Sequence, residues 1–132
     1  MSKRALRPTN LSFLPRPDYP YSPGSAAGGF VYTSGQVAWD DKGELVGRGD
    51  PAAQTRQVLS NVESVLREGG ATLDDVLKCN VYLADIRYFQ AMNDVFATFF
   101  PARPPARTTV QAPLAEPEML VEIEAIAWVG AE

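Results

Sequence analysis

Arg107 lies in a strand-like segment near the end of the sequence, where its side chain could bind a carboxylate. In the segment 106–112, Arg107 shares a predicted face with Thr109 and Gln111, because side chains alternate along a strand. A guanidinium can hold a carboxylate through two parallel hydrogen bonds, which a lysine ammonium cannot reproduce. On residue type alone, a surface ion pair is the more common role of such an arginine, so both interpretations stay open.

Two glutamates follow in the last predicted strand. Glu122 and Glu124 are predicted to point to one face, whereas Val121 and Ile123 point to the other. A carboxylate directed into a cleft can orient or deprotonate a water molecule, and burial raises its pKa towards the range useful for that task. The alternative for either glutamate is a structural ion pair, and we favour that alternative for Glu124.

Composition excludes several kinds of chemistry. The 132 residues contain no histidine, so Ser-His and Cys-His nucleophiles, histidine metal ligands and imidazole proton shuttles are absent. The single cysteine, Cys79, cannot form an intramolecular disulfide and is predicted to lie in the core. A net charge of −4 makes nucleic acid an unfavourable partner. We find no signal-peptide pattern and no apolar run long enough to span a bilayer, and expect a cytoplasmic protein.

The first part of the chain differs in composition from the rest. Proline fixes φ and lacks an N–H donor, so a proline-rich segment favours an extended arm over a helix or a central strand. We therefore predict an arm over residues 1–19 and a single α+β domain over residues 20–132. The prolines on which this rests are Pro8, Pro15, Pro17, Pro20 and Pro23.

Hydrophobic periodicity predicts the elements that must position these side chains. Alternating apolar residues indicate strands, and apolar residues three or four apart indicate amphipathic helices. Asp50 and Pro51 are typical of a helix start, and Gly69-Gly70 of its end. The predicted order is strands over 30–39 and 44–46, a helix from 51, a strand over 76–84, a helix over 85–101, and strands over 106–112 and 120–129.

The two predicted helices can cover only one face of the resulting mixed sheet. The second face would then expose a large hydrophobic patch unless other copies of the chain bury it. The sequence therefore predicts a homo-oligomer, and the resemblance described next points to a trimer.

Several stretches resemble the reactive intermediate deaminases, the Rid or YjgF family, some members of which are called L-PSP endoribonucleases. The similarity extends from about Pro20 to Trp128. It rests on Thr33-Ser34-Gly35-Gln36, on Pro105-Ala106-Arg107, on the run from Val121 to Ala127, and on the helix opening at Asp50-Pro51. The chain departs from the family by having Thr109 where a cysteine is common, and by its longer N-terminal arm.

The resemblance implies a chorismate-mutase-like α+β protomer in a homotrimer with a barrel core and pockets between subunits. It also implies hydrolysis of reactive 2-imino or aminoacrylate-type acids to a keto acid and ammonia, without metal or organic cofactor. The family pattern assigns catalytic roles to Arg107 and Glu122. It assigns substrate-binding positions to Tyr21, Ser34, Asn93 and Thr109.

Two other functions are weighed against the deaminase. A non-catalytic trimer could bind or sense small carboxylates such as 2-oxo acids through the same Arg107. Endoribonuclease or translation-inhibitor activity, attached to some relatives, has less support, because the chain is acidic and has no histidine for acid–base work on phosphodiesters.

Overall fold

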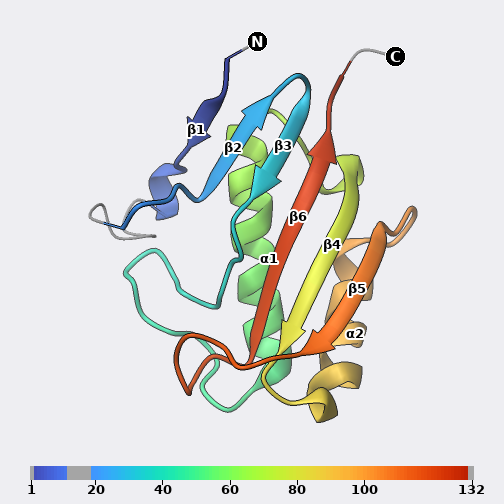
Figure 1. Ribbon diagram of the computed structural model, residues 1–132. Helices are drawn as coiled ribbons and strands as arrows, with labels where there is room; N and C mark the ends of the chain where they lie inside the picture. The colour runs from blue at the N-terminus through green and yellow to red at the C-terminus, as the bar shows by residue number, and fades with distance from the viewer. Residues whose placement is uncertain (1, 12–18, 131–132) are drawn as a thin grey trace.

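A single sheet with two helices on one of its faces forms the protein (Figure 1). The computed structural model describes residues 2–11 and 19–130; residues 1, 12–18 and 131–132, including Pro15 and Pro17 of the predicted arm, lie outside this description. The mixed α+β fold predicted from sequence is confirmed. The strands are β1 (Arg4–Leu6), β2 (Gly24–Ala27), β3 (Phe30–Thr33), β4 (Val76–Leu83), β5 (Ala106–Gln111) and β6 (Val121–Trp128), and the helices are α1 (Pro51–Glu68) and α2 (Phe89–Phe99).

Strand order across the sheet is β1-β2-β3-β6-β4-β5. Only β4 and β5 run parallel, because α2 forms the crossover between them; the other neighbours are antiparallel. This topology places β5 at an edge of the sheet with α2 packed beside it (Figure 1).

The boundaries of α1 follow its predicted signals. The Asp50 carboxylate accepts a hydrogen bond from the Ala53 N–H at 3.1 Å, Pro51 occupies the first turn and Gly69 caps the C-terminal end. The second helix begins later than predicted: Ile86–Tyr88 forms a short 3₁₀ turn first, stabilised by the Asp85 carboxylate accepting from the Arg87 N–H.

Two predicted strands are wrong in extent. The predicted strand 30–39 ends at Thr33, after which only Gln36 and Trp39 make isolated bridges. The predicted strand 44–46 is reduced to one bridge between Leu45 and Trp39. Both regions lie beyond the hairpin β2–β3, where the chain leaves the sheet to reach α1.

Strands β1 and β2 were not predicted. β1 lies inside the proline-rich segment and pairs with β2, so that Leu6 is buried although its neighbours are exposed. The sequence signal is weak because β2 consists of Gly-Ser-Ala-Ala, which has low strand propensity.

The core fills the space between the sheet and the helices. Cys79, Val81 and Leu83 of β4 are fully buried on this face, which confirms the core position predicted for Cys79. Leu77 is 54% exposed, contrary to the predicted alternation, because a bulge between Val76 and Lys78 shifts the register. In the part of the chain that the structure describes, no helix is long and apolar enough to cross a membrane.

Candidate active site

The Arg107 guanidinium lies against α2. In β5, Arg107 is in register with Cys79, so it points to the helix-covered face. Its Cζ atom is 4.8 Å from the centre of the Phe96 ring and 5.5 Å from that of Phe89, and its Nη1 is 3.8 Å from Met92 Sδ. These α2 residues hold the cation by cation–π and sulfur contacts that leave its other N–H groups available.

No carboxylate neutralises this guanidinium within the described residues. Arg48, Arg67, Arg87 and Arg103 each pair with an acidic side chain, whereas Arg107 takes part in no ion pair there. Partial burial lowers the pKa of Arg107 below its usual range, although guanidinium remains charged at any physiological pH. A partly desolvated cation without a partner favours binding of an anionic ligand.

Thr109 and Asn93 lie in the same region as Arg107. Thr109 is two residues further along β5, partly exposed and on the same face as Arg107. Asn93 is partly exposed in α2, one turn after Phe89 and next to Met92. Three of the six predicted site residues therefore belong to the β5–α2 side of the protein.

Glu122 lies on the opposite face of the sheet. It is paired with Tyr82 of β4, and both side chains point away from the helices, as does Glu124 beside Asn80. Burial, followed by the nearby Glu124 charge, raises the pKa of Glu122 above the ordinary glutamate value. Glu124 accepts a hydrogen bond from Asn80 Nδ2 at 3.0 Å, so among the described residues its partner is a neutral amide and not the ion-pair partner expected from sequence.

A glycine allows the Glu122 carboxylate to pack against the main chain. A Cβ atom on Gly35 would overlap the carboxylate and lie 2.9 Å from Glu122 Cδ. The neighbouring Gln36 is fixed to β6 by paired backbone hydrogen bonds with Ile123, at 2.8 and 3.1 Å. The group that approaches Gly35 is therefore the side chain of Glu122.

Tyr21 and Ser34 lie on the same side of the sheet as Glu122. The Ser34 hydroxyl donates to the Ser22 carbonyl at 2.6 Å, and the Ser34 N–H donates to the Pro23 carbonyl at 2.7 Å. Tyr21 is 53% exposed, and burial of its hydroxyl, then the Glu122 charge, raises its pKa. Tyr21 and Ser34 both line one cavity of about 320 Å³.

The predicted residues thus fall into two groups that one chain does not bring together. The first group, the arginine side, comprises Arg107, Thr109 and Asn93; the second, the glutamate side, comprises Glu122, Tyr21 and Ser34. Arg107 and Glu122 are two strands apart, roughly 10 Å across the sheet, and on opposite faces. A small substrate could not contact both within one protomer.

Sequence reasoning missed the residues that support Arg107. Phe89 is 38% exposed and lies beside the guanidinium, although the helical spacing of apolar residues over 85–101 gave no indication of this contact. The order strand–helix–strand over β4, α2 and β5 was the available signal, since a helix that connects two parallel strands must pack over one or both of them. Spacing alone did not show which face of α2 would meet Arg107.

Comparison with known proteins identifies the family. Residues 14–129 match the Endoribonuclease L-PSP family. The structure is similar to that of YyfA from Yersinia pestis, a Rid-family protein described as of unknown function, with 35% identity, coverage of 97% of this chain and all of that one, and a TM-score of 0.88. It is also similar to the YjgF gene product of E. coli, with 32% identity, coverage of 95% and 98%, and a TM-score of 0.84.

A further relative was solved with a small ligand. E. coli TdcF with bound serine is 30% identical, with coverage of 95% of this chain and 98% of that one, and a TM-score of 0.84. The matched segment contains every predicted site residue. The protein belongs to the Endoribonuclease L-PSP family, also known as the Rid or YjgF family, as the sequence indicated.

Proposed function

We propose that the protein hydrolyses reactive 2-imino or enamine acids to keto acids and ammonia, at sites formed between neighbouring copies in a homotrimer. The observation that carries this proposal is the half-buried Arg107 guanidinium, which no carboxylate of the described chain neutralises. Such a group favours a carboxylate ligand, and all substrates of the proposed class carry one.

Arg107 would fix the substrate carboxylate. Phe96 and Met92 contact the guanidinium, so its orientation is set before the substrate binds. The bound carboxylate would then orient the adjacent C=N carbon of the substrate. Thr109 and Asn93 lie near enough to this group to shape the same end of the pocket.

Glu122 would position and deprotonate the attacking water. Its raised pKa lies closer to neutrality than that of an exposed glutamate, which suits a general base. The water oxygen adds to the imine carbon while the nitrogen gains a proton, giving a carbinolamine. The C–N bond then breaks, the nitrogen leaves as ammonia, and the carbinolamine hydroxyl becomes the carbonyl of the keto acid. An enamine first gains a proton on carbon to give the iminium ion, the protonated imine, which water then attacks in the same way.

A second copy would complete the site. The face of the sheet that carries Glu122 also exposes Phe30, Tyr32 and Val110, at 41%, 48% and 42%. This apolar surface favours burial against other copies. Because β5 is an edge strand, a neighbouring copy packed on this face at that edge would bring the arginine side of one protomer close to the glutamate side of the next.

The main alternative is carboxylate binding without turnover. The relative TdcF was solved with bound serine, a small amino acid that carries a carboxylate, which fits either function. The endoribonuclease in the family's name receives little support here, since the chain has a net charge of −4 and no histidine.

Ammonia release separates these functions. The purified protein would be mixed with 2-aminoacrylate, 3-aminoacrylate and bulkier imines generated in situ, and ammonia and keto acid would be measured against the uncatalysed rate. We expect acceleration that is lost in Arg107→Ala. Saturable 2-oxo acid binding with no acceleration of any imine would support the binding alternative and contradict the deaminase.

A further inference from the structure

A cavity of about 320 Å³ lies beside the glutamate side of the site, and the N-terminal strand forms one of its walls. Tyr21 and Ser34 line it together with Ser25 and Tyr32, so several hydroxyl-bearing side chains lie along it. Ser25 and Tyr32 are paired across β2 and β3, on the face of the sheet away from the helices.

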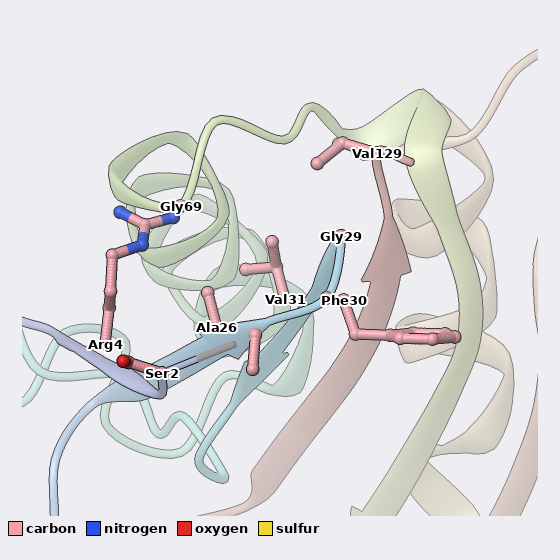
Figure 2. Close-up of a pocket in the computed structure, with 10 residues that line it drawn as sticks. Ser2, Arg4, Ala26, Gly29, Phe30, Val31, Gly69 and Val129 are labelled. Carbon is pink, nitrogen blue, oxygen red and sulfur yellow. The ribbon is translucent and has the colours of Figure 1, made fainter. Parts of the chain in front are cut away.

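Lys3 reaches this cavity because side chains alternate along the N-terminal strand. Lys3 and Ala5 line it, whereas Leu6 is 2% exposed and packs beneath the sheet. Arg4 points the other way and lines a second cavity with Ala26, Val31 and Gly69 (Figure 2). The pairing of β1 with β2 and the buried Leu6 fix the position of Lys3 relative to Tyr21 and Ser34.

The two ends of the cavity differ in charge. Among the described residues that line it, Lys3 is the only charged one. At the other end, the Glu122 carboxylate is close enough to Tyr21 to affect its pKa. Continuing the pairing of β1 and β2 places Lys3 opposite Ala27, and thus level with Phe30, four residues from Ser34 or roughly 13 Å along the sheet. A flexible lysine side chain spans part of that distance.

We propose that Lys3 determines specificity, by selecting imino acids with a second acid group at the end of the side chain, as in imines of dicarboxylic amino acids. This inference rests on the proposed function. The reacting end of the substrate would lie at Glu122 and the neighbouring copy's Arg107, and its distal carboxylate would extend along the hydroxyl-lined cavity towards the Lys3 ammonium. A substrate with an apolar side chain gains nothing from that cation.

Paired variants at Lys3 and Arg4 test the assignment. We would measure kcat/KM for the imines of glutamate and of 2-aminobutyrate in the wild type, Lys3→Gln, Lys3→Arg and Arg4→Gln. Lys3→Gln should reduce the preference for the dicarboxylic imine about five- to tenfold, by lowering its kcat/KM alone, and Lys3→Arg should restore most of it. Arg4→Gln removes an equal charge one residue away on the opposite face, so it should leave the preference unchanged.

Salt dependence gives a further check, because Lys3 is exposed and its attraction for a distal carboxylate is screened. The wild-type preference should shrink as the salt concentration rises from 0.02 to about 0.5 M, and the Lys3→Gln preference should stay flat. An unchanged preference in Lys3→Gln, or an equal loss in Arg4→Gln, would overturn the assignment.

Binding of reaction products separates failure of this inference from failure of the proposed function. Calorimetric titration with 2-oxoglutarate and 2-oxobutanoate needs no turnover. Absence of deamination with a Lys3-dependent preference for 2-oxoglutarate would reject the deaminase but retain the role of Lys3. Deamination with no Lys3-dependent preference in either assay would reject the role of Lys3 alone.

Discussion

The two faces of the sheet surround their functional side chains in contrasting ways. On the helix-covered face, Arg107 is held by aromatic rings and a thioether, with no counter-charge in the described chain. On the open face, Glu122 lies against the backbone at Gly35 and near the Tyr21 hydroxyl. The arginine side is built to retain an uncompensated cation, and the glutamate side to hold a carboxylate with a raised pKa. Because one protomer does not bring the arginine side and the glutamate side together, we expect activity to require two copies of the chain.

Mixed oligomers provide the strongest test of this comparison. Arg107→Ala and Glu122→Gln should each lose turnover almost completely when pure. Co-refolding them at equal concentration should restore about a quarter of wild-type activity if each site takes its arginine and its glutamate from different copies, because one in four neighbouring pairs carries both intact groups. The measurement is ammonia release before and after mixing, with trimer mass checked by light scattering.

A control uses the double variant mixed with wild type, which should give no more activity than dilution predicts. If the Arg107→Ala and Glu122→Gln mixture stays inactive although hybrids form, both groups act within one chain or one of them is not in the site. A monomeric mass for the wild type would remove the basis of the comparison.

Arg107→Lys should have the next largest effect. The ammonium keeps the charge but cannot form two parallel hydrogen bonds to a carboxylate or stack flat on Phe96. A lost charge-assisted hydrogen bond costs about 1.5–3 kcal/mol, so kcat/KM should fall roughly tenfold to a hundredfold. Near-normal turnover in Arg107→Lys would show that charge alone is needed, and near-normal turnover in Arg107→Ala would place the site elsewhere.

The raised pKa of Glu122 predicts how activity depends on pH. Burial raises the pKa of Glu122, so a general base at this position loses activity on acidification at a higher pH than an ordinary glutamate would. The acidic limb of kcat/KM should therefore lie above pH 4.5, and Glu122→Gln should remove it from the residual rate.

As the pH falls through the raised pKa of Glu122, the contribution of this residue to the free energy of unfolding should become more favourable while activity decreases. Because the folded chain binds this proton more tightly than the unfolded chain does, ionised Glu122 destabilises the fold near pH 7, and the penalty disappears as the pH falls through the raised pKa. Glu122→Gln should therefore not lower Tm at pH 7. A clear loss of Tm there would indicate a structural role for the carboxylate.

Sequence predicted the first helix and the C-terminal strands better than the N-terminal strands. Helix α1 and strands β4, β5 and β6 have caps or strong alternation, which local physics specifies. Strand β1 is three residues long beside prolines, and its pairing with β2 depends on burial of Leu6, a tertiary contact. Arg107 and Glu122 could be assigned to opposite sheet faces only once the register across β5, β4 and β6 was known.

The smallest predicted effect concerns the ring beneath Arg107, and Phe100 supplies a matched control. Phe96 and Phe100 are similarly buried, at 5% and 6%, and their rings stack with centroids 4.7 Å apart; Arg107 lies over Phe96. Phe96→Leu and Phe100→Leu should lower Tm by similar amounts, because both trade an aromatic ring for a smaller side chain in the same cluster. Only Phe96→Leu removes a cation–π contact of about 0.5–2 kcal/mol, so it should raise the Kd for a 2-oxo acid several-fold while Phe100→Leu leaves it near the wild-type value. Equal Kd values in the two variants would mean that Phe96 only fills the core, and that backbone position, Phe89 and Met92 suffice to orient the guanidinium.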